Sequence, residues 1–368
     1  MKICHVINDL SRGGAESHLY SLVTLQVKKG YDISILLLGK DLHNFVTLEN
    51  EFKSLDLKLN RLKGLKKFQG INPFSIYKAI GYFKKNKFDI IHTHTPRSDF
   101  LAYSSNLFLK NKGKRIVTIH GKYGTYLQGN FLIDYLRKVF IRQQSKIWKK
   151  ASNVIVISES IKDWLEQLNS SIKPIVIPYG VEIPKAPHKD KLTNPTIGYL
   201  GKLNKNKGIE DLIDVYTKFQ EKENSSNFEL NLLIGGVGSE NYIKSLKNKN
   251  KVNNIKFLGY VEDRYTFFNS IEIFVFPSYS EGLGLVLLEA MAHGVVCITR
   301  DVTPMNSIVD NKENGFLFKD NKELLEIIEM VLNLDSTEKN KLIQSAIEKI
   351  EKSYSIMQMY LSTEKAYN

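Results

Sequence analysis

The chain alternates between short apolar runs and longer stretches in which apolar residues recur every three or four positions. Apolar runs of four to eight residues that end at Gly, Pro or polar residues are typical of buried strands, and the periodic stretches are typical of helices. The expected strands are residues 3–7, 32–38, 89–94, 115–119, 153–157 and 174–180, followed by 196–200, 230–234, 255–258, 271–276 and 295–298. Strands that alternate with helices predict the α/β class with parallel sheets.

The expected strands fall into two series, which are separated by a segment without periodicity. Residues 181–195 carry three prolines together with charged residues, and we interpret them as a linker. A chain of 368 residues is long enough for two domains. We therefore expect a doubly wound domain in residues 1–180, a second domain in residues 196–352, and an amphipathic helix in residues 353–368.

The first expected strand leads into a glycine turn, Ser-Arg-Gly-Gly-Ala-Glu, which begins at Ser11 and opens a helix. The turn lacks the G-x-G-x-x-G spacing of dinucleotide-binding loops, and no acidic residue closes the second strand, so a dinucleotide site is poorly supported. Gly13 and Gly14 either contact a phosphate or an acceptor, or simply start the helix.

The segment 277–294 has the most distinctive pattern in the chain. It follows the apolar strand 271–276, and Gly282 and Gly284 mark a tight turn within it. Residues 285–292 are then predicted to form a helix that is apolar on nearly all sides and is therefore buried. A glycine-opened helix offers free backbone N–H groups, which are a favourable site for a phosphate.

Two glutamates flank this expected phosphate site. Glu281 would lie on the loop, and Glu289 would lie well inside the buried helix, where a carboxylate needs a partner. One carboxylate on each side of an anion site suits a ligand with hydroxyl groups at both ends and phosphate in the middle. A nucleotide sugar has this layout.

Further loops follow the other strands of the second half. Lys202 and Lys207 lie on the glycine-flanked loop 201–208, where they could clamp a diphosphate or could simply be solvated. Glycine loops around Gly236 and Val261 follow two later strands, but such loops are common in α/β proteins.

The two glutamates stand in the frame Glu-Gly-Leu-Gly…Leu-Glu-Ala-Met-Ala-x-Gly, which begins at Glu281 and places the second carboxylate at Glu289. This frame resembles the signature of retaining glycosyltransferases of family 4. The resemblance implies the GT-B fold, in which two Rossmann-like domains face a cleft and the helix at 353–368 crosses back to the first domain. The implied reaction transfers a sugar from a nucleoside-diphosphate sugar to an acceptor hydroxyl with retention at the anomeric carbon. The alternative for Glu289 is a helix residue that caps a neighbouring loop.

The resemblance also assigns roles to residues. Lys202 and Lys207 would stabilise the departing nucleoside diphosphate, although arginine is usual at the first position and lysine lacks its bidentate geometry. Glu281 would hold hydroxyls of the donor sugar, Glu289 would hold the ribose hydroxyls, and His120 would position the sugar. The catalytic set is thus His120, Glu281, Lys202 and Lys207. The other expected donor-site residues are Gly13, Gly14, Gly236, Val261, Gly282, Leu283, Gly284, Leu285 and Glu289.

We expect neither an essential metal nor a cofactor, because the chain has no Asp-x-Asp motif and its co-substrate would be a UDP- or GDP-linked sugar. No pair of carboxylates is arranged as nucleophile and acid, so a glycosidase is unsupported. Two other histidines lie at a strand end. His92 is interpreted as structural, and His94 is either structural or part of the site.

The net charge of +13 is unevenly placed. Residues 1–180 carry +16 and residues 181–368 carry −3, which predicts an anionic partner for the first half. Two basic clusters contain apolar residues, one at 61–68 and one on the expected helix 131–150. Either the apolar residues pack inward and the cations are solvated, or the clusters rest on an anionic membrane surface. The acceptor would then be a glycan or lipid-linked glycan, as in family members that build bacterial surface polysaccharides.

Other features favour a cytoplasmic protein that is peripheral on the inner face of the membrane. Cys4 and Cys297 are expected to be reduced core residues, and no apolar run reaches the roughly 18 residues that span a bilayer. Two other functions stay open. A sugar-nucleotide epimerase of similar fold would use a similar ligand, whereas a nucleic-acid-binding protein would explain the charge but lacks a supporting motif.

Overall fold

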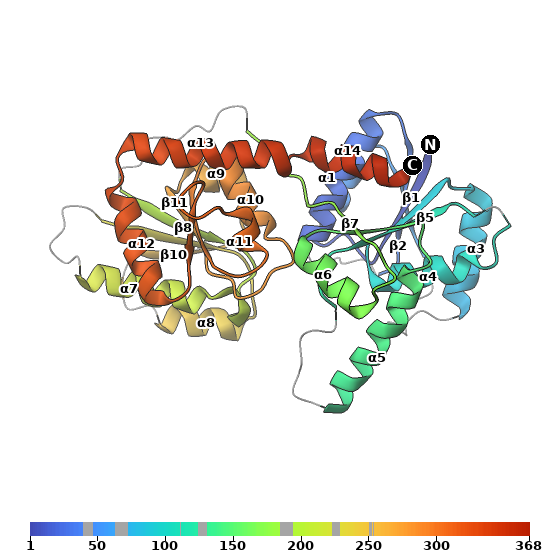
Figure 1. The fold of residues 1–368 in the computed structure, drawn as a ribbon, viewed down its shortest axis with the longest axis horizontal. Coiled ribbons are helices and arrows are strands. Elements are labelled where there is room, and N and C mark those ends of the chain that lie inside the picture. The colour runs from blue at the N-terminus through green and yellow to red at the C-terminus, as the bar shows by residue number, and fades with distance from the viewer. Residues whose placement is uncertain are drawn as a thin grey trace. The chain divides into compact units, whose positions relative to one another are not determined.

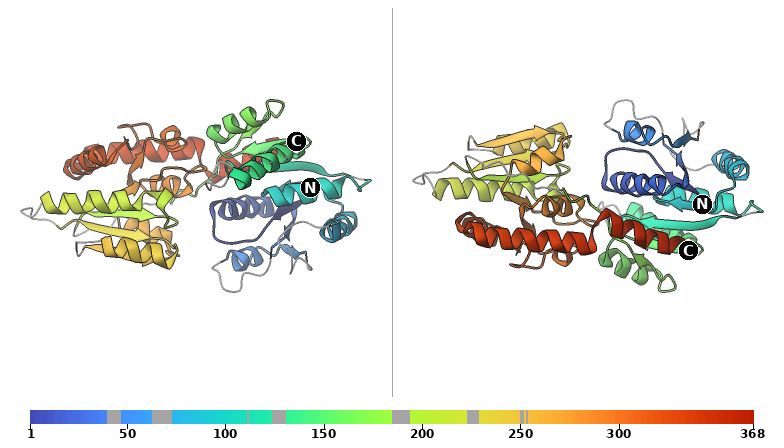
Figure 2. Two further views of the ribbon diagram at one scale, coloured as in Figure 1. Left: turned by 90° about the horizontal axis from the view of Figure 1, so that it is seen from below. Right: turned by 90° about the horizontal axis from the view of Figure 1, so that it is seen from above.

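A computed structural model gives the structure of residues 1–39, 47–62, 73–110, 112–123, 131–184, 194–222, 229–249, 252 and 254–368. The chain forms two compact units, Met1–Gly180 together with Ile356–Asn368, and Val181–Ser355 (Figure 1). Each unit contains a parallel sheet with helices on both of its faces (Figure 2). This confirms the predicted α/β class with two Rossmann-like domains. Within the described ranges, no helix is both long and apolar enough to cross a membrane.

The sheet of the first unit has the strand order β3-β2-β1-β4-β5-β6-β7. Because successive side chains of a strand point to opposite faces, β1 contributes to two apolar clusters. Ile3 and Ile7 pack with α1 and α14, whereas Cys4 and Val6 pack with α3 and α4. The strands are β1 (Lys2–Ile7), β2 (Asp32–Leu37), β3 (Lys58–Arg61), β4 (Ile90–Thr93), β5 (Lys114–Ile119), β6 (Asn153–Val156) and β7 (Ile175–Val176).

The helices of the first unit include the last helix of the chain. Tyr367 at the end of α14 is 2% exposed and lies in the same apolar cluster as Leu19 and Leu22 of α1. The helices are α1 (Gly14–Lys28), α2 (Glu49–Lys53), α3 (Pro73–Asn86), α4 (Pro96–Asn106), α5 (Phe131–Trp148), α6 (Glu159–Leu168) and α14 (Ile356–Tyr367).

The sheet of the second unit has the order β10-β9-β8-β11-β12-β13. The order reverses between β8 and β11, and ligands of doubly wound sheets bind at such a switch point, beyond the carboxyl ends of the strands. The strands are β8 (Thr196–Leu200), β9 (Asn231–Gly235), β10 (Ile255–Gly259), β11 (Ile273–Phe276), β12 (Val296–Arg300) and β13 (Phe316–Phe318).

The predicted apolar helix is α10 (Leu285–Ala292), and Gly294 follows it with φ +68°, as expected of a helix stop. Leu287, Leu288 and Met291 of α10 are fully buried, and α10 packs against α13. The other helices of this unit are a 3₁₀ turn η1 (Lys205–Lys207), α7 (Ile209–Lys222), α8 (Glu240–Lys249), α9 (Arg264–Asn269), α11 (Met305–Ile308), α12 (Asn321–Asn333) and α13 (Ser336–Ser353).

Some details differ from the sequence interpretation. The last strand of the first sheet is β7, which has only two residues instead of the expected 174–180. Residues 181–184 of the expected linker belong to the second unit, where Val181 forms a β-bridge with Ser355, and 185–193 lie outside the described residues. Both cysteines are buried, as expected of core residues.

Candidate functional site

The loops that follow β8 and β11 leave the second sheet at its switch point, because these two strands are hydrogen-bonded neighbours. The first loop carries Lys202 and Lys207, and the second carries Glu281. The sequence-predicted residues of the second unit therefore start from the edge of the sheet where a ligand is expected.

Lys207 and Glu281 form an ion pair, with 2.5 Å between Lys207 Nζ and Glu281 Oε1. Both side chains are less than a fifth exposed. The backbones of the two loops also touch, since the Tyr279 N–H donates to the Asn206 carbonyl at 2.9 Å. Gly208 adopts φ +65°, and a Cβ there would lie 2.2 Å from the Pro277 carbonyl oxygen. Glycine at this position therefore allows the lysine loop to lie directly on the end of β11.

The turn that starts α10 depends on a second glycine. Gly284 is the N-cap of α10 and adopts the left-handed conformation, with φ +92°. Leu283 is buried just before it, and Leu285 is the first residue of the helix. The first N–H groups of α10 therefore point outward at this turn, which favours the binding of an anion such as phosphate.

Glu289 is paired with Arg264, the first residue of α9. Both of its carboxylate oxygens accept from Arg264 Nη1, the Oε2 atom at 2.5 Å. Its side chain is 19% exposed, and Leu285 and Val286 are also only partly buried, so one side of α10 is accessible rather than fully enclosed as predicted. The carboxylate does have the partner that burial requires, but no pattern in the sequence distinguishes Arg264 as that partner.

Three glycine-containing loops pack together at the carboxyl ends of β8, β9 and β10. Gly236 has φ +139°, and a Cβ there would lie 1.7 Å from the Gly201 carbonyl oxygen, so only glycine fits. Its N–H donates to the Gly259 carbonyl at 2.6 Å. The side chain of Val261 lies against Gly235, and Lys202 is exposed at the start of the first loop. The predicted positions Lys202, Gly236 and Val261 are thus neighbours in space.

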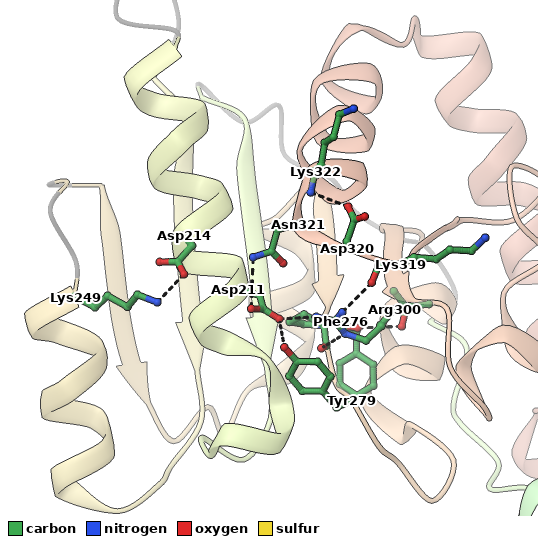
Figure 3. A network of polar contacts seen from close by, with 12 residues as sticks. Asp211, Asp214, Lys249, Phe276, Tyr279, Arg300, Lys319, Asp320, Asn321 and Lys322 are labelled. Atoms are coloured by element: carbon green, nitrogen blue, oxygen red, sulfur yellow. Dashed lines mark hydrogen bonds and ion pairs between the residues drawn. The ribbon is translucent and has the colours of Figure 1, made fainter.

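Arg300 at the end of β12 links the loop after β11 to the first turn of α7, which follows the lysine loop (Figure 3). It is 7% exposed, donates from Nη2 to Asp211 Oδ2 at 2.6 Å and from Nε to the Pro277 carbonyl at 3.0 Å, and lies 4.1 Å from the Tyr279 ring centroid. The Tyr279 hydroxyl donates to the same Asp211 oxygen at 2.5 Å. Asp211 lies in α7 four residues after Lys207, and Tyr279 is two residues before Glu281, so Arg300 bridges segments that lie next to both members of the ion pair.

His120 lies in the first unit, directly after β5. Its Nδ1 lies 2.8 Å from the Tyr179 hydroxyl, and its Nε2 lies 3.3 Å from His94 Nδ1. Burial lowers the pKa of His120 to about 3, so the imidazole is neutral near pH 7. Both ring nitrogens already have partners within the unit.

The other two histidines of the sequence interpretation are fully buried. His92 makes contacts at 2.8 Å to the Tyr367 hydroxyl and at 2.7 Å to Thr118 Oγ1, which confirms its structural interpretation. His94 lies between His120 and His5. One ring nitrogen from each of His5, His92 and His94 lies within 4.8 Å of the other two, which is a spacing that could hold a metal ion.

The glycine turn of the first unit starts α1. Gly13 is the N-cap in an extended conformation, and a Cβ there would lie 2.5 Å from Glu16 Oε2. A Cβ on Gly14 would lie 3.4 Å from the Tyr179 ring. Burial raises the pKa of Glu16 to about 7. The turn thus lies beside Tyr179, which also contacts His120.

Comparison with known proteins places these features in a family. The description "Glycosyltransferase Family 4" matches residues 12–184, and "Glycosyl transferases group 1" matches residues 182–349. CapM of Staphylococcus aureus, a capsular polysaccharide biosynthesis glycosyltransferase, is 28% identical over 320 residues and covers 80% of either chain. WclY of Escherichia coli, an O-antigen biosynthesis glycosyltransferase, is 25% identical over 257 residues, which are 66% of this chain and 69% of WclY.

Solved structures support the same fold. Anabaena HepE in complex with UDP and glucose has a TM-score of 0.79 at 16% identity, covering 99% of this chain and 98% of that chain. Sucrose-phosphate synthase from Thermosynechococcus elongatus has a TM-score of 0.80 at 19% identity, covering 100% and 98%. Because the two family matches together span residues 12–349, the chain belongs to the glycosyltransferases of the family 4 type and has the GT-B fold.

Proposed function

We propose that this glycosyltransferase moves a sugar from a UDP-linked donor to an acceptor hydroxyl, with retention at the anomeric carbon and without a metal ion. The observation that carries the proposal is the Lys207–Glu281 pair at the switch point of the second sheet, beside the glycine-started N-terminus of α10. The crystal structures of HepE with UDP-glucose and of Staphylococcus aureus TarM with UDP support uridine as the base.

The charges around the switch point fit a diphosphate. Lys202, Lys207 and Arg264 provide three cations against the carboxylates of Glu281 and Glu289, and the N-terminus of α10 adds a partial positive charge. When a diphosphate binds, the Lys207 ammonium would contact its oxygens, and Glu281 would accept hydrogen bonds from the sugar. Glu289, held by Arg264, would accept from the ribose hydroxyls.

In the proposed reaction the bond between the anomeric carbon and the phosphate oxygen breaks, and the acceptor oxygen bonds to that carbon on the same face. The proton of the acceptor hydroxyl passes to the departing phosphate oxygen. Lys202, Lys207 and the N–H groups after Gly282 stabilise the charge that builds on the diphosphate, which lowers the barrier. His120 is neutral and therefore has no proton to supply as an imidazolium.

The first experiment is a thermal-shift screen over UDP, GDP and their sugar derivatives, because ligand binding raises the apparent stability. A shift with UDP but not with GDP supports the donor class. Incubation of the preferred UDP-sugar with an acceptor should give a product with the donor's anomeric configuration by NMR. Release of an epimerised nucleotide sugar without acceptor would instead show an epimerase. Addition of a chelator should leave turnover unchanged, and metal-reversible loss would refute metal independence.

The acceptor is proposed to be a lipid-linked glycan at an anionic membrane surface. The support is the exposed part of α5, where several apolar side chains are accessible beside cations. We call these residues the α5 exposed segment: Ile133, Tyr135, Leu136, Val139 and Phe140, with Arg137, Lys138 and Arg142. The relatives that act in capsule and O-antigen biosynthesis support an acceptor of this class.

The inner side of α5 is fixed in the first unit. Trp148 is fully buried and donates from Nε1 to Asp99 Oδ2 at 2.7 Å, and Ile141 is 6% exposed. Helix α5 therefore packs through some apolar residues and exposes others, and the exposed ones support the proposed membrane contact. The other basic cluster is the one at 61–68. There Arg61 pairs with Glu49 at 2.5 Å and Leu62 is 9% exposed, whereas 63–68 lie outside the described residues.

A further inference from the structure

A continuous series of hydrogen-bonded side chains connects His120 to the C-terminal helix within the first unit. All of its contacts lie between 2.7 and 3.3 Å. In order, the contacts are Tyr179 Oη to His120 Nδ1, His120 Nε2 to His94 Nδ1, His94 Nε2 to His5 Nδ1, His5 Nε2 to Gln26 Oε1, Gln26 Nε2 to Tyr367 Oη, Tyr367 Oη to His92 Nδ1, and His92 Nε2 to Thr118 Oγ1. We call these residues the imidazole series.

The imidazoles of this series are neutral near pH 7, because burial lowers their pKa values, that of His5 to about 4. A neutral imidazole has one N–H donor and one acceptor nitrogen. Each contact in the series therefore needs a donor on one side and an acceptor on the other. The direction of one hydrogen bond fixes the direction of its neighbours.

Gln26 sets that direction, because its amide has an oxygen on one side and an NH₂ group on the other. The Oε1 atom faces His5, so His5 Nε2 carries the proton and His5 Nδ1 accepts from His94 Nε2–H. His94 Nδ1 then accepts from His120 Nε2–H. On the other side, Gln26 Nε2 donates to Tyr367, whose hydroxyl donates to His92. Every donor in the series thus meets one acceptor.

We propose that Gln26 is a positioning residue for sugar transfer, which fixes His120 as the Nε2–H tautomer through His5 and His94 and leaves Nδ1 as the acceptor of the Tyr179 hydroxyl. The proposal rests on the role that the family resemblance implies for His120, which is to position the donor sugar. His120 then presents one fixed dipole and orientation to the reaction. Gln26 is fully buried on α1. The side chains of His5 and His94 lie between it and His120, so Gln26 acts without touching the substrate.

A metal ion on His5, His92 and His94 would be a competing explanation of the same cluster. Each of these six ring nitrogens already lies at hydrogen-bond distance from a partner in the series. A metal would need a lone pair from every ligand and would break the contact between His5 and His94. The hydrogen-bonded arrangement leaves no donor or acceptor of these rings unused, and we therefore favour it.

The test is ¹⁵N NMR of the full chain with labelled histidine, since protonated and unprotonated ring nitrogens give separate signals. The wild type should show His120, His94 and His5 as Nε2–H tautomers. Gln26→Met removes both the acceptor and the donor of the amide at similar volume. It should give mixed tautomers at His120 and lower kcat about tenfold, or about 1.4 kcal/mol, with KM for the donor and UDP affinity unchanged.

Two further variants separate this role from a structural one. Gln26→Glu keeps an acceptor for His5 and should keep the His120 tautomer, with kcat within about threefold of the wild type. Thr118→Val breaks the series at its far end and should change only the His92 signals. Both remain informative if Gln26→Met fails to fold.

A wild-type Nδ1–H tautomer at His120, or a Gln26→Met variant with wild-type tautomers and kcat, would overturn the proposal. So would a stoichiometric bound metal whose removal changes the histidine signals. If His120 has no role in sugar transfer, the result is different: His120→Ala would keep its turnover, while the wild-type protein would still show the assigned tautomers.

Discussion

The two glutamates of the 277–294 segment are held by different cations, and this decides what each can do. Glu281 pairs with a lysine, whose compact ammonium group can exchange a carboxylate for a phosphate oxygen. Glu289 pairs with an arginine, whose planar group holds a carboxylate in a fixed orientation. We therefore regard Glu281 as the member that rearranges on binding and Glu289 as the preorganised one.

Replacing Glu289 by Gln should weaken UDP binding about tenfold, because the amide loses charge and presents an NH₂ group where the ribose hydroxyls need an acceptor; this corresponds to about 1.4 kcal/mol. Isothermal titration with UDP measures the change. Glu326→Gln is the matched control, since Glu326 is an exposed helix residue whose ion pair with Lys322 is on the surface. Equal affinities in the wild type and in both variants would remove Glu289 from the donor site.

Arg300 gives a second prediction at the level of single residues. Arg300→Met should lower the free energy of unfolding by about 1–3 kcal/mol, because the carboxylate of Asp211 and two carbonyl groups lose a charged donor. It should also weaken UDP-sugar binding, since the loop after β11 and the helix that follows the lysine loop lose a common support. Asp214→Asn is the control, because Asp214 lies on α7 like Asp211 but forms an exposed ion pair with Lys249 (Figure 3). An exposed pair of this kind contributes about 0–1 kcal/mol to stability. A variant with wild-type unfolding and binding would contradict the supporting role.

These partnerships mark the limit of what sequence reasoning could find. Glu281 and Lys207 were assigned to one site because each follows a strand and the family frame links them. Arg264, Arg300 and Gln26 have no local pattern that sets them apart from surface or helix residues, since their roles depend on contacts 25, 89 and 341 positions away. Only the folded chain shows these pairs.

At the scale of elements, the hydrophobic pattern predicted the central strands and α10 within a residue or two. Prediction was weaker where local signals compete. Ser158 and Ser160 are both typical N-cap residues, and α6 begins at Glu159 with Ser158 as its N-cap in an extended conformation. The sequence alone does not distinguish the two serines, whereas the extended backbone of Ser158 makes it the N-cap. The strand β3, whose residues are only partly buried, has no strong apolar run and was not predicted.

Helix α5 carries the prediction that belongs to this scale. The protein should co-sediment with vesicles that contain anionic lipid, and binding should fall between low and high salt because exposed charges are screened. Arg137→Glu with Lys138→Glu should reduce binding by the electrostatic route, and Leu136→Ser with Phe140→Ser by the apolar route. Lys162→Glu is the control, because Lys162 is a partly exposed cation on α6 that is not one of the residues of the α5 exposed segment. The proposed place at a membrane surface would be excluded if the wild-type protein did not bind anionic vesicles at low salt and yet had full activity on a water-soluble acceptor.

At the scale of the whole molecule, the buried imidazoles predict a fold that is sensitive to acid. The pKa values of His5 and His120 are lowered by burial to about 4 and about 3, from 6.5. Between those values and 6.5 the unfolded chain binds more protons than the folded chain. Stability therefore falls as the pH falls through this window, by up to about 1.4 kcal/mol per pH unit for each such histidine.

Glu16 acts in the opposite direction, because burial raises its pKa from 4.5 to about 7 and its contribution is lost as the pH rises through 7. The histidines outnumber it, since burial also lowers the pKa values of His18, His92 and His94. Urea unfolding midpoints should therefore fall between about pH 6.5 and pH 4.5. His5→Asn should flatten this dependence, and a midpoint that stays constant over the same range would contradict the account.

Helix α14 has a consequence for the order in which the protein is made. Residues 1–180 leave the ribosome before α14 does, so their sheet core lacks Met359, Tyr360 and Tyr367 until α14 has been synthesised. The second unit does not require α14, because Val181 and Ser355 pair with each other at its two ends. During synthesis the N-terminal half must therefore remain an incomplete domain while the C-terminal half closes. Chaperone binding and premature proteolysis should accordingly concentrate on the half that was translated first.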